Sequence, residues 1–522
     1  MSWFQLSLSK WTLGGIAVLL FLIYDFWKQT FLRRKGIPGP FPYPIVGSTF
    51  SVTGGFATDT LKLRKTYGKI FGISMFGRPS IFIADLDMIR ETLISRFSVF
   101  PNRETLPLKD RPLDQSISSL KGEQWREARN TLTPAFTGNK LRQMDPIINE
   151  CCDQLVEHLD QLSKDESTIQ FKEVFGSYTM DIIAATFFGL KIDSHKNPND
   201  PFVKHAQDAF SITLFSPRVL LVMLTPWICP LMNKLDIGLI PAYIKNFFMK
   251  IVKGTIASRE SSESKRVDML QLMMNAHNLG SEEGEDSSSK KKPLSTDAIM
   301  ANSLVFFLAG YETTNTSLSF TSYLLATNPE VQAKLIEEVD KFTLTRDDVC
   351  YDVLKEMEYL DACIKESLRI YPSVAATERE NDKGNVIKGL EIPKDVSVTI
   401  PIYAIHHDPD LWEEPEQFRP ERFNKENQDK IHPMAWLPFG AGPRICIGLR
   451  LAMVEMKFAL IRILQKYEFK TCSDTEISLL SRVNLHRIYH GLVPVELFYH
   501  LDLGRPCHSF LFHTRFLETN LF

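Results

Sequence analysis

The sequence has few cysteines and no excess of charge of either sign. Eight of 522 residues are Cys, and no two form a Cys-x-x-Cys pair, which argues against a disulfide scaffold or a structural zinc site and favours a reducing compartment. The 60 Lys and Arg residues nearly balance the 63 Asp and Glu residues, whereas nucleic-acid binders are usually strongly basic. With 24% charged and 44% apolar residues, the composition also excludes collagen-like, coiled-coil and largely disordered chains.

Charge is scarcest at the N-terminus. Residues 11–24 carry none, and residues 1–27 hold only Lys10 and Asp25. The apolar stretch can reach the length of about 20 residues that a membrane-spanning helix needs, and it lacks the cleavage site of a signal peptide. Basic residues follow it directly, so the positive-inside rule predicts one anchor with the remaining chain in the cytoplasm. A buried core helix is the alternative interpretation.

The rest of the chain is predicted to form one helix-rich domain. Four prolines within residues 38–44 predict a stiff, extended hinge. The acidic and lysine-rich residues 280–293 predict a solvated loop, and residues 211–233 form either core or an apolar flap at the membrane. Hydrophobic periodicity predicts a mostly α fold with small β-sheets, with helices at 141–163, 294–326, 330–342, 351–370 and 449–465 and strands at 70–75, 80–84 and 397–400.

The most informative stretch is FGAGPRICIG, residues 439–448. Ile445 stands where a dinucleotide-binding G-x-G-x-x-G needs glycine, and no second Cys or His lies at zinc-ligand spacing. What remains is Cys446 in a glycine-rich loop before a predicted helix, where backbone N–H groups favour a thiolate. Arg444 can bind a carboxylate, and Phe439 can shield the sulfur from water. A shielded thiolate is a strong electron donor to iron.

This stretch matches the haem-binding signature of cytochrome P450s, F-x-x-G-x-R-x-C-x-G, at every fixed position. Other motifs of that family follow the expected order along the chain: W-x-x-x-R at 125–129, AGYETT at 309–314, E-x-x-R at 366–369 and PERF at 420–423. The chain resembles cytochrome P450s from the proline hinge to about Cys472. Within the family it is similar to the family-three microsomal enzymes that oxidise drugs and steroids, through MEYLD at 357–361, RVDMLQLM at 266–273 and NPNDPF at 197–202.

The resemblance implies a haem b whose iron takes the Cys446 thiolate as its axial ligand. Arginine suits the haem propionates because its planar fork binds carboxylates bidentately. The residues implied to contact the haem are Cys446, Arg444, Trp125, Arg129, Arg379, Arg103, Phe439 and Gly442. Glu366 and Arg369 are one helical turn apart, and the resemblance adds Arg422 as the third member of a network that holds the haem loop.

The resemblance also implies the catalytic and substrate-contacting residues. Thr313 lies inside an apolar helix, where it can bond back to the carbonyl of Ala309 and open room for oxygen and water. With Glu312 beside it, a proton path towards the haem becomes feasible. The implied substrate-contacting residues are Ser118, Leu308, Ala309, Ser373, Val374 and Ala375.

The expected activity is monooxygenation of lipophilic molecules in the endoplasmic reticulum membrane. Because we find no flavin or nicotinamide site in the sequence, the electrons are expected from NADPH-cytochrome P450 reductase, with cytochrome b5 as a second donor. A basic docking face would comprise Lys121, Arg126, Arg142, Arg450 and Lys457. Three alternatives stay open: a P450 isomerase of the thromboxane-synthase kind, an inactive haem-binding membrane protein, and a chain that does not fold stably.

The C-terminal end departs from the family. Family-three enzymes end in a β-hairpin whose tip lines the substrate pocket, a pattern that we do not find in residues 477–522, which hold five of the 12 His. His406 and His407 lack partners at ligand spacing and are predicted to be polar surface residues. The expected organisation is an anchor at 1–27, a hinge at 28–47, a catalytic domain at 48–476 and a divergent tail at 477–522.

Overall fold

The computed structural model describes residues 2–103, 108–165, 169–210, 216–261, 268–282, 294–472, 475 and 509–514. Helices dominate, as the periodicity predicted. They are α1 (Ser2–Gln29), α2 (Phe31–Arg34), α3 (Phe56–Tyr67), α4 (Leu86–Arg90), α5 (Gly122–Leu132), α6 (Gly138–Arg142), α7 (Asp145–Leu162), α8 (Phe171–Ile183), α9 (Pro201–Phe210), α10 (Pro217–Leu224), α11 (Cys229–Lys234), α12 (Ala242–Glu260), α13 (Met269–Glu282), α14 (Thr296–Thr327), α15 (Pro329–Phe342), α16 (Glu358–Ile370), α17 (Ile402–His406), α18 (Lys425–Gln428) and α19 (Leu449–Leu464).

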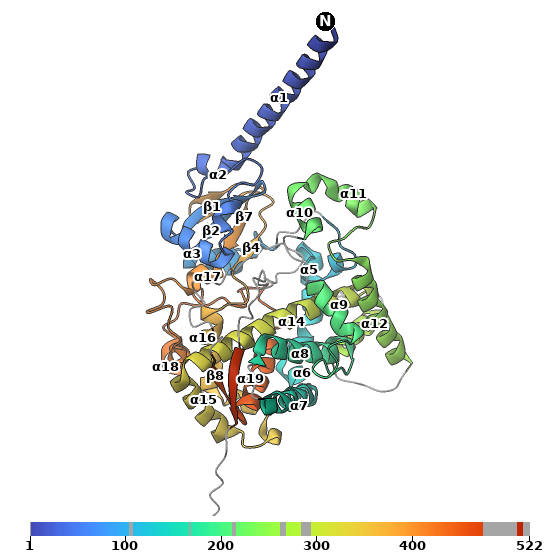
Figure 1. Ribbon diagram of the computed structural model, residues 1–522, viewed down its shortest axis with the longest axis vertical. Helices are drawn as coiled ribbons and strands as arrows, with labels where there is room; N and C mark the ends of the chain where they lie inside the picture. The colour runs from blue at the N-terminus through green and yellow to red at the C-terminus, as the bar shows by residue number, and fades with distance from the viewer. Residues whose placement is uncertain are drawn as a thin grey trace, which may run out of the picture.

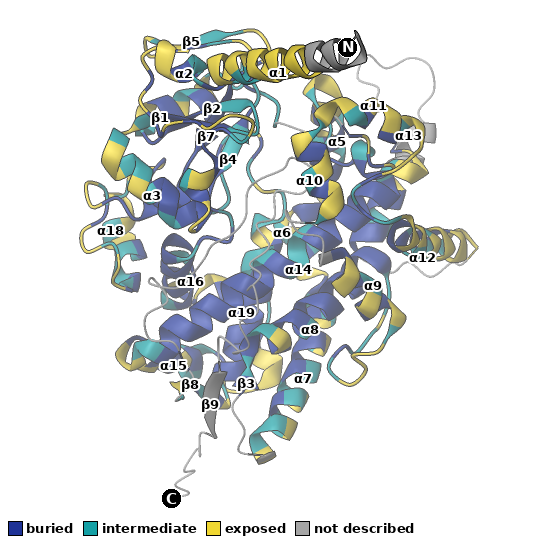
Figure 2. Ribbon diagram, turned by 45° about the horizontal axis from the view of Figure 1, so that its top comes forward, coloured by how far each residue is buried: buried dark blue, intermediate teal, exposed yellow. Residues whose placement is uncertain are grey.

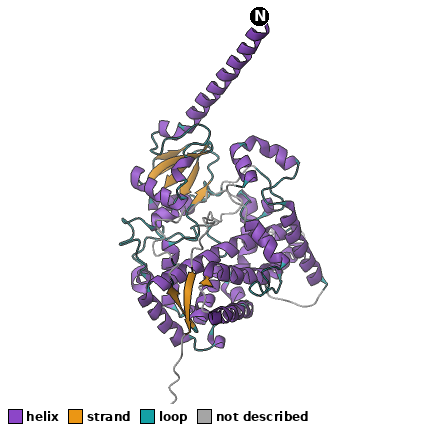
Figure 3. Cartoon of the chain, in the orientation of Figure 1, coloured by secondary structure: helices purple, strands orange, loops and turns teal. Residues whose placement is uncertain are grey.

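The strands form three small sheets (Figure 3). The four-stranded sheet has the order β1-β2-β7-β4, in which β2 pairs antiparallel with β1 and parallel with β7. A three-stranded sheet has the order β3-β9-β8, and β5 pairs with β6. The strands are β1 (Ile70–Met75), β2 (Arg78–Ile83), β3 (Ile169–Gln170), β4 (Thr377–Arg379), β5 (Asn385–Ile387), β6 (Leu390–Ile392), β7 (Ser397–Ile400), β8 (Tyr467–Thr471) and β9 (Ser509–Thr514).

Helix α1 projects from the end of the body that carries the four-stranded sheet (Figure 1). Its segment Trp11–Gln29 is long and apolar enough to cross a membrane, and its large apolar side chains are exposed. The base of the helix is fastened to the body: Asp25 accepts the N–H of Ile45 at 2.5 Å, and the buried Gln29 accepts a hydrogen bond from Ser74. The predicted N-terminal apolar helix is therefore present as a candidate anchor, and hydrogen bonds attach its C-terminal end to the body.

The proline-rich hinge lies against β1. The carbonyl of Pro38 accepts the N–H of Gly72 at 2.8 Å. A Cβ on Gly39 would come within 2.1 Å of the Gly72 carbonyl oxygen, so only glycine permits this approach. The hinge is packed chain rather than a free linker.

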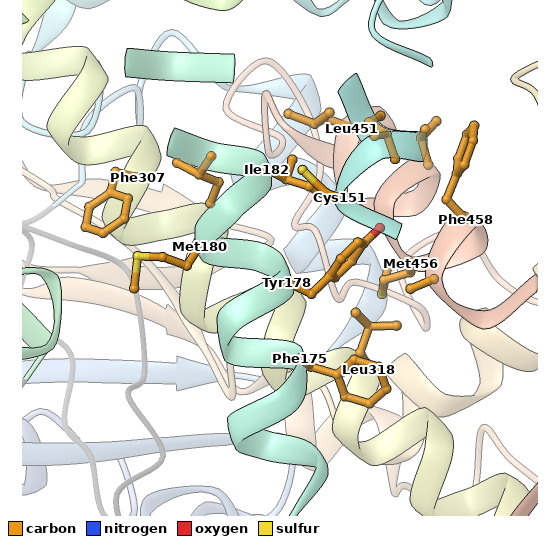
Figure 4. Packing of buried hydrophobic residues seen from close by; sticks show 14 of the residues in the cluster. Cys151, Phe175, Tyr178, Met180, Ile182, Phe307, Leu318, Leu451, Met456 and Phe458 are labelled. Carbon is orange, nitrogen blue, oxygen red and sulfur yellow. The ribbon is translucent and has the colours of Figure 1, made fainter. Parts of the chain in front are cut away.

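Helix α14 runs through the centre of the body and is buried along most of its length (Figure 2). Several of its hydroxyls bond to the carbonyl four residues earlier, as Thr313 does to Ala309 at 2.7 Å and Thr321 does to Ser317 at 2.7 Å. This pattern lets a helix rich in Ser and Thr stay buried without unpaired hydroxyls at these positions. Helices α8 and α19 pack against it, and Figure 4 shows Phe175 and Tyr178 of α8 near Leu318 of α14 and Met456 of α19.

The predicted elements differ from the structure in several places. The predicted helix 141–163 is divided, because α6 ends at Arg142 and α7 begins at Asp145. Helix α16 begins at Glu358 rather than at residue 351, because a separate 3₁₀ turn occupies Val353–Lys355. Helix α13 extends to Glu282, into the predicted loop, whose residues 283–293 lie outside the described residues.

The C-terminal tail contributes a strand that the sequence pattern did not predict. β9 pairs antiparallel with β8, Phe469 opposite Phe512, and with β3 on its other side. Backbone pairing depends little on side-chain identity, so an unfamiliar sequence can still complete a sheet. Of the tail, only 509–514 lies among the described residues.

Candidate functional site

A central cavity lies between α14 and the loop that precedes α19. The volume of this cavity is about 240 Å³. Apolar side chains, among them Ile183, Val305 and Phe306, form much of its wall. The cavity gathers these residues selected from the sequence: Arg103, Ser118, Trp125, Arg129, Ala309, Thr313, Ser373, Val374, Arg379, Phe439, Arg444 and Cys446.

Four of the residues selected as haem, catalytic or substrate contacts do not line this cavity: Leu308, Ala375, Glu312 and Gly442. Leu308 is buried and belongs to the main helical core, so its packing is that of an ordinary core residue. Ala375 packs with the residues around β1 and β2. The predicted direct substrate contacts of Leu308 and Ala375 therefore have no support in the geometry.

Gly442 lies on the side of the loop that faces away from the cavity, against the Leu93 carbonyl. Its φ is +73°, and a Cβ would come within 2.0 Å of the Leu93 carbonyl oxygen. Any side chain would push the loop off α4 and the turn that follows it. Gly442 acts through the backbone path rather than by contact with a ligand.

The loop presents the Cys446 thiol to the cavity. The Cys446 N–H bonds to the Phe439 carbonyl at 2.9 Å and the Ile445 N–H to that of Gly442 at 3.0 Å. Cys446 keeps accessible surface on its cavity side, although protein atoms surround its sulfur closely. Burial raises the pKa of the Cys446 thiol, while the N–H groups of Gly448 and Leu449 and nearby arginines oppose the rise.

Arginines give the cavity a surplus of positive charge. Burial lowers the pKa of Arg444 to about 8 and that of Arg379 to about 9, and neighbouring arginines contribute to both shifts. Burial likewise lowers the pKa of Arg129. The Nε atoms of Arg379 and Arg444 are buried and have no hydrogen-bond partner in the described part of the chain. Buried cations without anions are unfavourable, so this cluster fits an anionic ligand with more than one carboxylate, such as the two propionates of haem.

Trp125 is part of the same cluster. The guanidinium of Arg444 lies over its ring, 4.3 Å from the ring centroid, and the Arg444 Nη2 donates to the Leu120 carbonyl at 2.8 Å. These contacts fix the direction of the Arg444 side chain. Trp125 therefore positions an arginine as well as lining the cavity.

Thr313 faces the cavity from α14, and Glu312 faces the other way. The Thr313 hydroxyl bonds to the Ala309 carbonyl, as its position in the helix predicted. The Glu312 carboxyl is nearly buried, 3.7 Å from the half-exposed Lys172 ammonium of α8. The two adjacent residues thus lie on different sides of α14, Thr313 towards the cavity and Glu312 towards α8.

Glu366, Arg369 and Arg422 form the predicted network. Arg369 makes two hydrogen bonds of 2.8 Å to Glu366, and the Arg422 Nε lies 3.2 Å from the same carboxylate. Arg369 also donates to the His406 carbonyl at 2.9 Å. Because Glu366 and Arg369 are fully buried, the network fixes the chain segments that supply its partners.

His406 joins this network to the Cys446 loop, a role that the sequence did not indicate. The prediction of surface histidines is wrong: His406 and His407 are 0% and 1% exposed. The His406 Nε2 accepts the N–H of Leu437 at 2.8 Å, and its Nδ1 lies 3.0 Å from the Arg369 carbonyl. Burial holds the pKa of His406 well below its usual value, so the ring is neutral and can accept at one nitrogen.

Glu455 of α19 is another residue that the sequence analysis missed. It lines the cavity at 2% exposure. Burial raises the pKa of its carboxyl to about 8, and a hydrogen bond from Thr314 opposes the rise. Glu455 is therefore largely protonated at neutral pH, a property that depends on its surroundings and not on a sequence motif.

The predicted basic docking face needs one correction. Lys457 is 8% exposed, forms an ion pair with Asp361 at 2.7 Å and donates to the Leu354 carbonyl, so it cannot belong to an exposed face. Lys121 and Arg142 are ion-paired with Glu380 and Asp352. Arg126 is paired with Glu123, and Arg450 is exposed.

Comparison with known proteins identifies the family. The family model described as Cytochrome P450 matches residues 37–485. Cytochrome P450 3A14 of Cavia porcellus is 41% identical over 475 residues, which cover 91% of this chain and 93% of the relative. Cytochrome P450 3A41 of Mus musculus is 42% identical over 486 residues, and cytochrome P450 3A12 of Canis lupus familiaris is 40% identical over 494 residues. These cover 92% and 94% of this chain, and 95% and 96% of the relatives. Since both measures extend over most of its length, the chain belongs to the cytochrome P450 family, as one of its family-three members.

Proposed function

We propose that this haem-thiolate monooxygenase inserts one oxygen atom from O2 into lipophilic substrates such as steroids and xenobiotics. The observation that carries the proposal is the central cavity, which brings Cys446, an arginine cluster and Thr313 together within apolar walls. Bound haem supplies the redox chemistry that activates dioxygen. The apolar walls favour lipophilic molecules, because transfer of apolar surface out of water is favourable by about 25 cal/mol per Å².

The haem is held by the residues that the cavity gathers. Cys446 would bind the haem iron through its thiolate, and Arg103, Arg129, Arg379 and Arg444 would bind the propionates, with Trp125 beside Arg444. Phe439 shields the thiolate from water. The buried cations support this assignment, because haem propionates would supply carboxylates to Arg379 and Arg444, whose Nε atoms have no hydrogen-bond partner in the described part of the chain.

Proton supply is the task of Thr313 and Glu312. The Thr313 hydroxyl is the proton-bearing group on the cavity side of α14. Glu312 takes up protons on the side of α14 that faces α8, where its nearly buried carboxyl lies 3.7 Å from the half-exposed Lys172 ammonium. Ser118, Ala309, Ser373 and Val374 contact the substrate.

The electrons come from NADPH through cytochrome P450 reductase, with cytochrome b5 as a second donor. The docking face comprises Lys121, Arg126, Arg142 and Arg450. The chain is a single-pass protein of the endoplasmic reticulum membrane with its body in the cytoplasm, because basic residues cluster just after the apolar part of α1.

Of the other functions considered, an isomerase of the thromboxane-synthase kind is disfavoured, since such enzymes dispense with the acid–alcohol pair that Glu312 and Thr313 supply. The strand formed by residues 509–514 argues against a tail that prevents folding. An inactive haem-binding protein would show a normal spectrum of the reduced CO complex without turnover.

Cys446→Ser should abolish the red-shifted Soret band of the reduced CO complex, because an alcohol oxygen cannot replace the thiolate as donor. The measurement is a reduced CO difference spectrum of microsomes that contain the variant. Cys472→Ser is the matched control, since Cys472 lies outside the cavity lining. A normal shifted band in the Cys446 variant would refute the assignment.

Arg379→Met should weaken haem retention by roughly 10- to 150-fold, the equivalent of losing a charge-assisted hydrogen bond of about 1.5–3 kcal/mol. The haem-free protein should be at least as resistant to urea as the parent, because the buried cation is removed. Haem transfer to apomyoglobin and urea unfolding of the haem-free protein measure the two effects. Arg126→Met, on the exposed face of α5, is the control. Unchanged haem transfer would exclude Arg379 as a propionate ligand.

Thr313→Ala should leave the CO spectrum and haem content near normal while product formed per NADPH oxidised falls. Proton delivery by a positioned group is typically worth about 10²–10⁴-fold, and water can partly replace one hydroxyl, so the lower end or less is expected. The measurement compares product, peroxide and NADPH consumption on a steroid probe with added reductase. Thr321→Ala, on the same helix but outside the cavity lining, is the control. Equal coupling in both variants would remove Thr313 from the mechanism.

Protease added to intact microsomes should digest the body from Lys28 onward, because the body faces the cytoplasm. Antibodies against the two ends of the chain measure the result: the N-terminal signal should persist while the C-terminal signal is lost. A body that resists digestion until detergent is added would place it on the lumenal side.

A further inference from the structure

One wall of the central cavity is built by a segment with little regular structure. We call residues 108–118 the wall segment; its 3₁₀ turn Leu113–Gln115 is followed by Ile117 and Ser118, both of which line the cavity. A segment of this kind holds its position only through contacts with other elements. Its 3₁₀ turn packs against α14, where Leu113 is buried in the main core and the Ser295 hydroxyl donates to Gln115, and buried polar contacts hold its two ends.

At the far end, Asp110 is a buried carboxylate with three donors. Its side chain is 1% exposed and accepts the N–H groups of Leu239 and Ile240 at 2.9 and 3.0 Å. The third donor is the Lys245 ammonium of α12 at 2.7 Å. Lys245 is itself buried, with a side chain 7% exposed. The pair thus joins the wall segment to the first turn of α12 and to the chain that leads into it.

Lys109 and Leu108, which precede Asp110, contact the neighbouring helices α10 and α11. The Lys109 N–H donates to the Asn233 side chain at 2.7 Å. Leu108 packs with Val219, Met223 and Met232 of α10 and α11. A Cβ on Gly238 would lie 2.0 Å from the Asp110 carboxylate, so a glycine is required where the chain passes this close.

At the cavity end, the Ile117 N–H donates to the Asn302 Oδ1 of α14 at 2.9 Å. Asn302 is fully buried, and its Nδ2 donates to the Ala298 carbonyl at 2.7 Å. The wall segment is therefore fixed between two buried polar contacts that lie on opposite sides of its 3₁₀ turn.

A buried ion pair gains little net stability, because the desolvation of both charges offsets their attraction. Its geometric effect is larger: three donors converging on one carboxylate permit few alternative positions of the chain that carries it. This combination suits a group that positions a neighbour rather than one that adds stability.

We propose that Asp110, paired with Lys245, is a positioning residue that determines substrate selectivity, by holding the wall segment so that Ile117 and Ser118 present a fixed surface to the cavity. The inference rests on the proposed function, because it takes the cavity as the substrate site. Removing the carboxylate frees the wall segment at one end and lets these two residues change position relative to the substrate.

The test compares Asp110→Asn and Lys245→Met in the haem-loaded, full-length protein. Gly238→Ala is an independent variant, because its methyl group displaces the carboxylate without changing any charge. Gly254→Ala is its matched control, since a Cβ at Gly254 meets no atom within 4 Å. Glu157→Gln, which breaks the exposed pair with Lys196, is the control for loss of a carboxylate.

Hydrogen exchange of the Ile117 amide and the ratio of products from a steroid with several oxidation sites are measured. We expect Ile117 to exchange at least about tenfold faster in the three test variants, the product ratio to change by at least about threefold, and the KM to rise more than kcat falls. Lys245→Arg, which keeps the cation, should restore parental values. The CO spectrum should stay normal in all variants.

Unchanged exchange at Ile117 together with an unchanged product ratio would overturn the proposal, even if the variants unfold more easily. Faster exchange with an unchanged product ratio would also overturn it, since Asp110 would then be merely structural. If no variant and no parent enzyme turns over the steroid despite a normal CO spectrum, the proposed function fails instead. The exchange at Ile117 then decides by itself whether Asp110 holds the wall segment.

Discussion

The buried carboxylate of Glu366 is the contact on which the arrangement of the site depends. It binds two arginines, Arg369 and Arg422, with no exposure of its own. Arg369 then reaches the carbonyl of His406, whose ring accepts the N–H of Leu437. Two residues later the chain enters the loop that carries Cys446. Because Glu366, Arg369, His406 and Leu437 are buried and hydrogen-bonded, displacing one would leave its neighbours unsatisfied, which is costly in a low-dielectric interior.

In the cavity, by contrast with this network, some buried charged side chains lack a partner of opposite charge among the described residues. There the chain keeps several arginines in apolar surroundings without carboxylate partners at Arg379 and Arg444 among the described residues. Such an arrangement lowers the stability of the protein alone and favours a ligand that brings anions. Folding and haem binding are therefore linked, because binding to the folded form stabilises it by mass action.

The C-terminal end illustrates how a sheet tolerates a changed sequence. Residues 509–514 pair with β8 and β3 through the backbone, so the three-stranded sheet is completed by a segment that follows no family pattern. The catalytic groups lie upstream of this strand. Within the described part of the chain, the residues that line the cavity also precede this strand.

Much of the fold and the site followed from the sequence because local rules apply to them. The spacing of Glu366 and Arg369, the glycine-rich loop around Cys446 and the back-bonded Thr313 depend on residues a few positions apart, and β1 and β7 have the bounds that their patterns predicted. Long-range contacts were not readable in this way. Four features depend on contacts between segments far apart along the chain. They are the burial of His406, the position of Glu312 beside Lys172, the burial of Lys457 and the pairing of Asp110 with Lys245. Their environments depend on which elements pack together, and only the tertiary structure decides that.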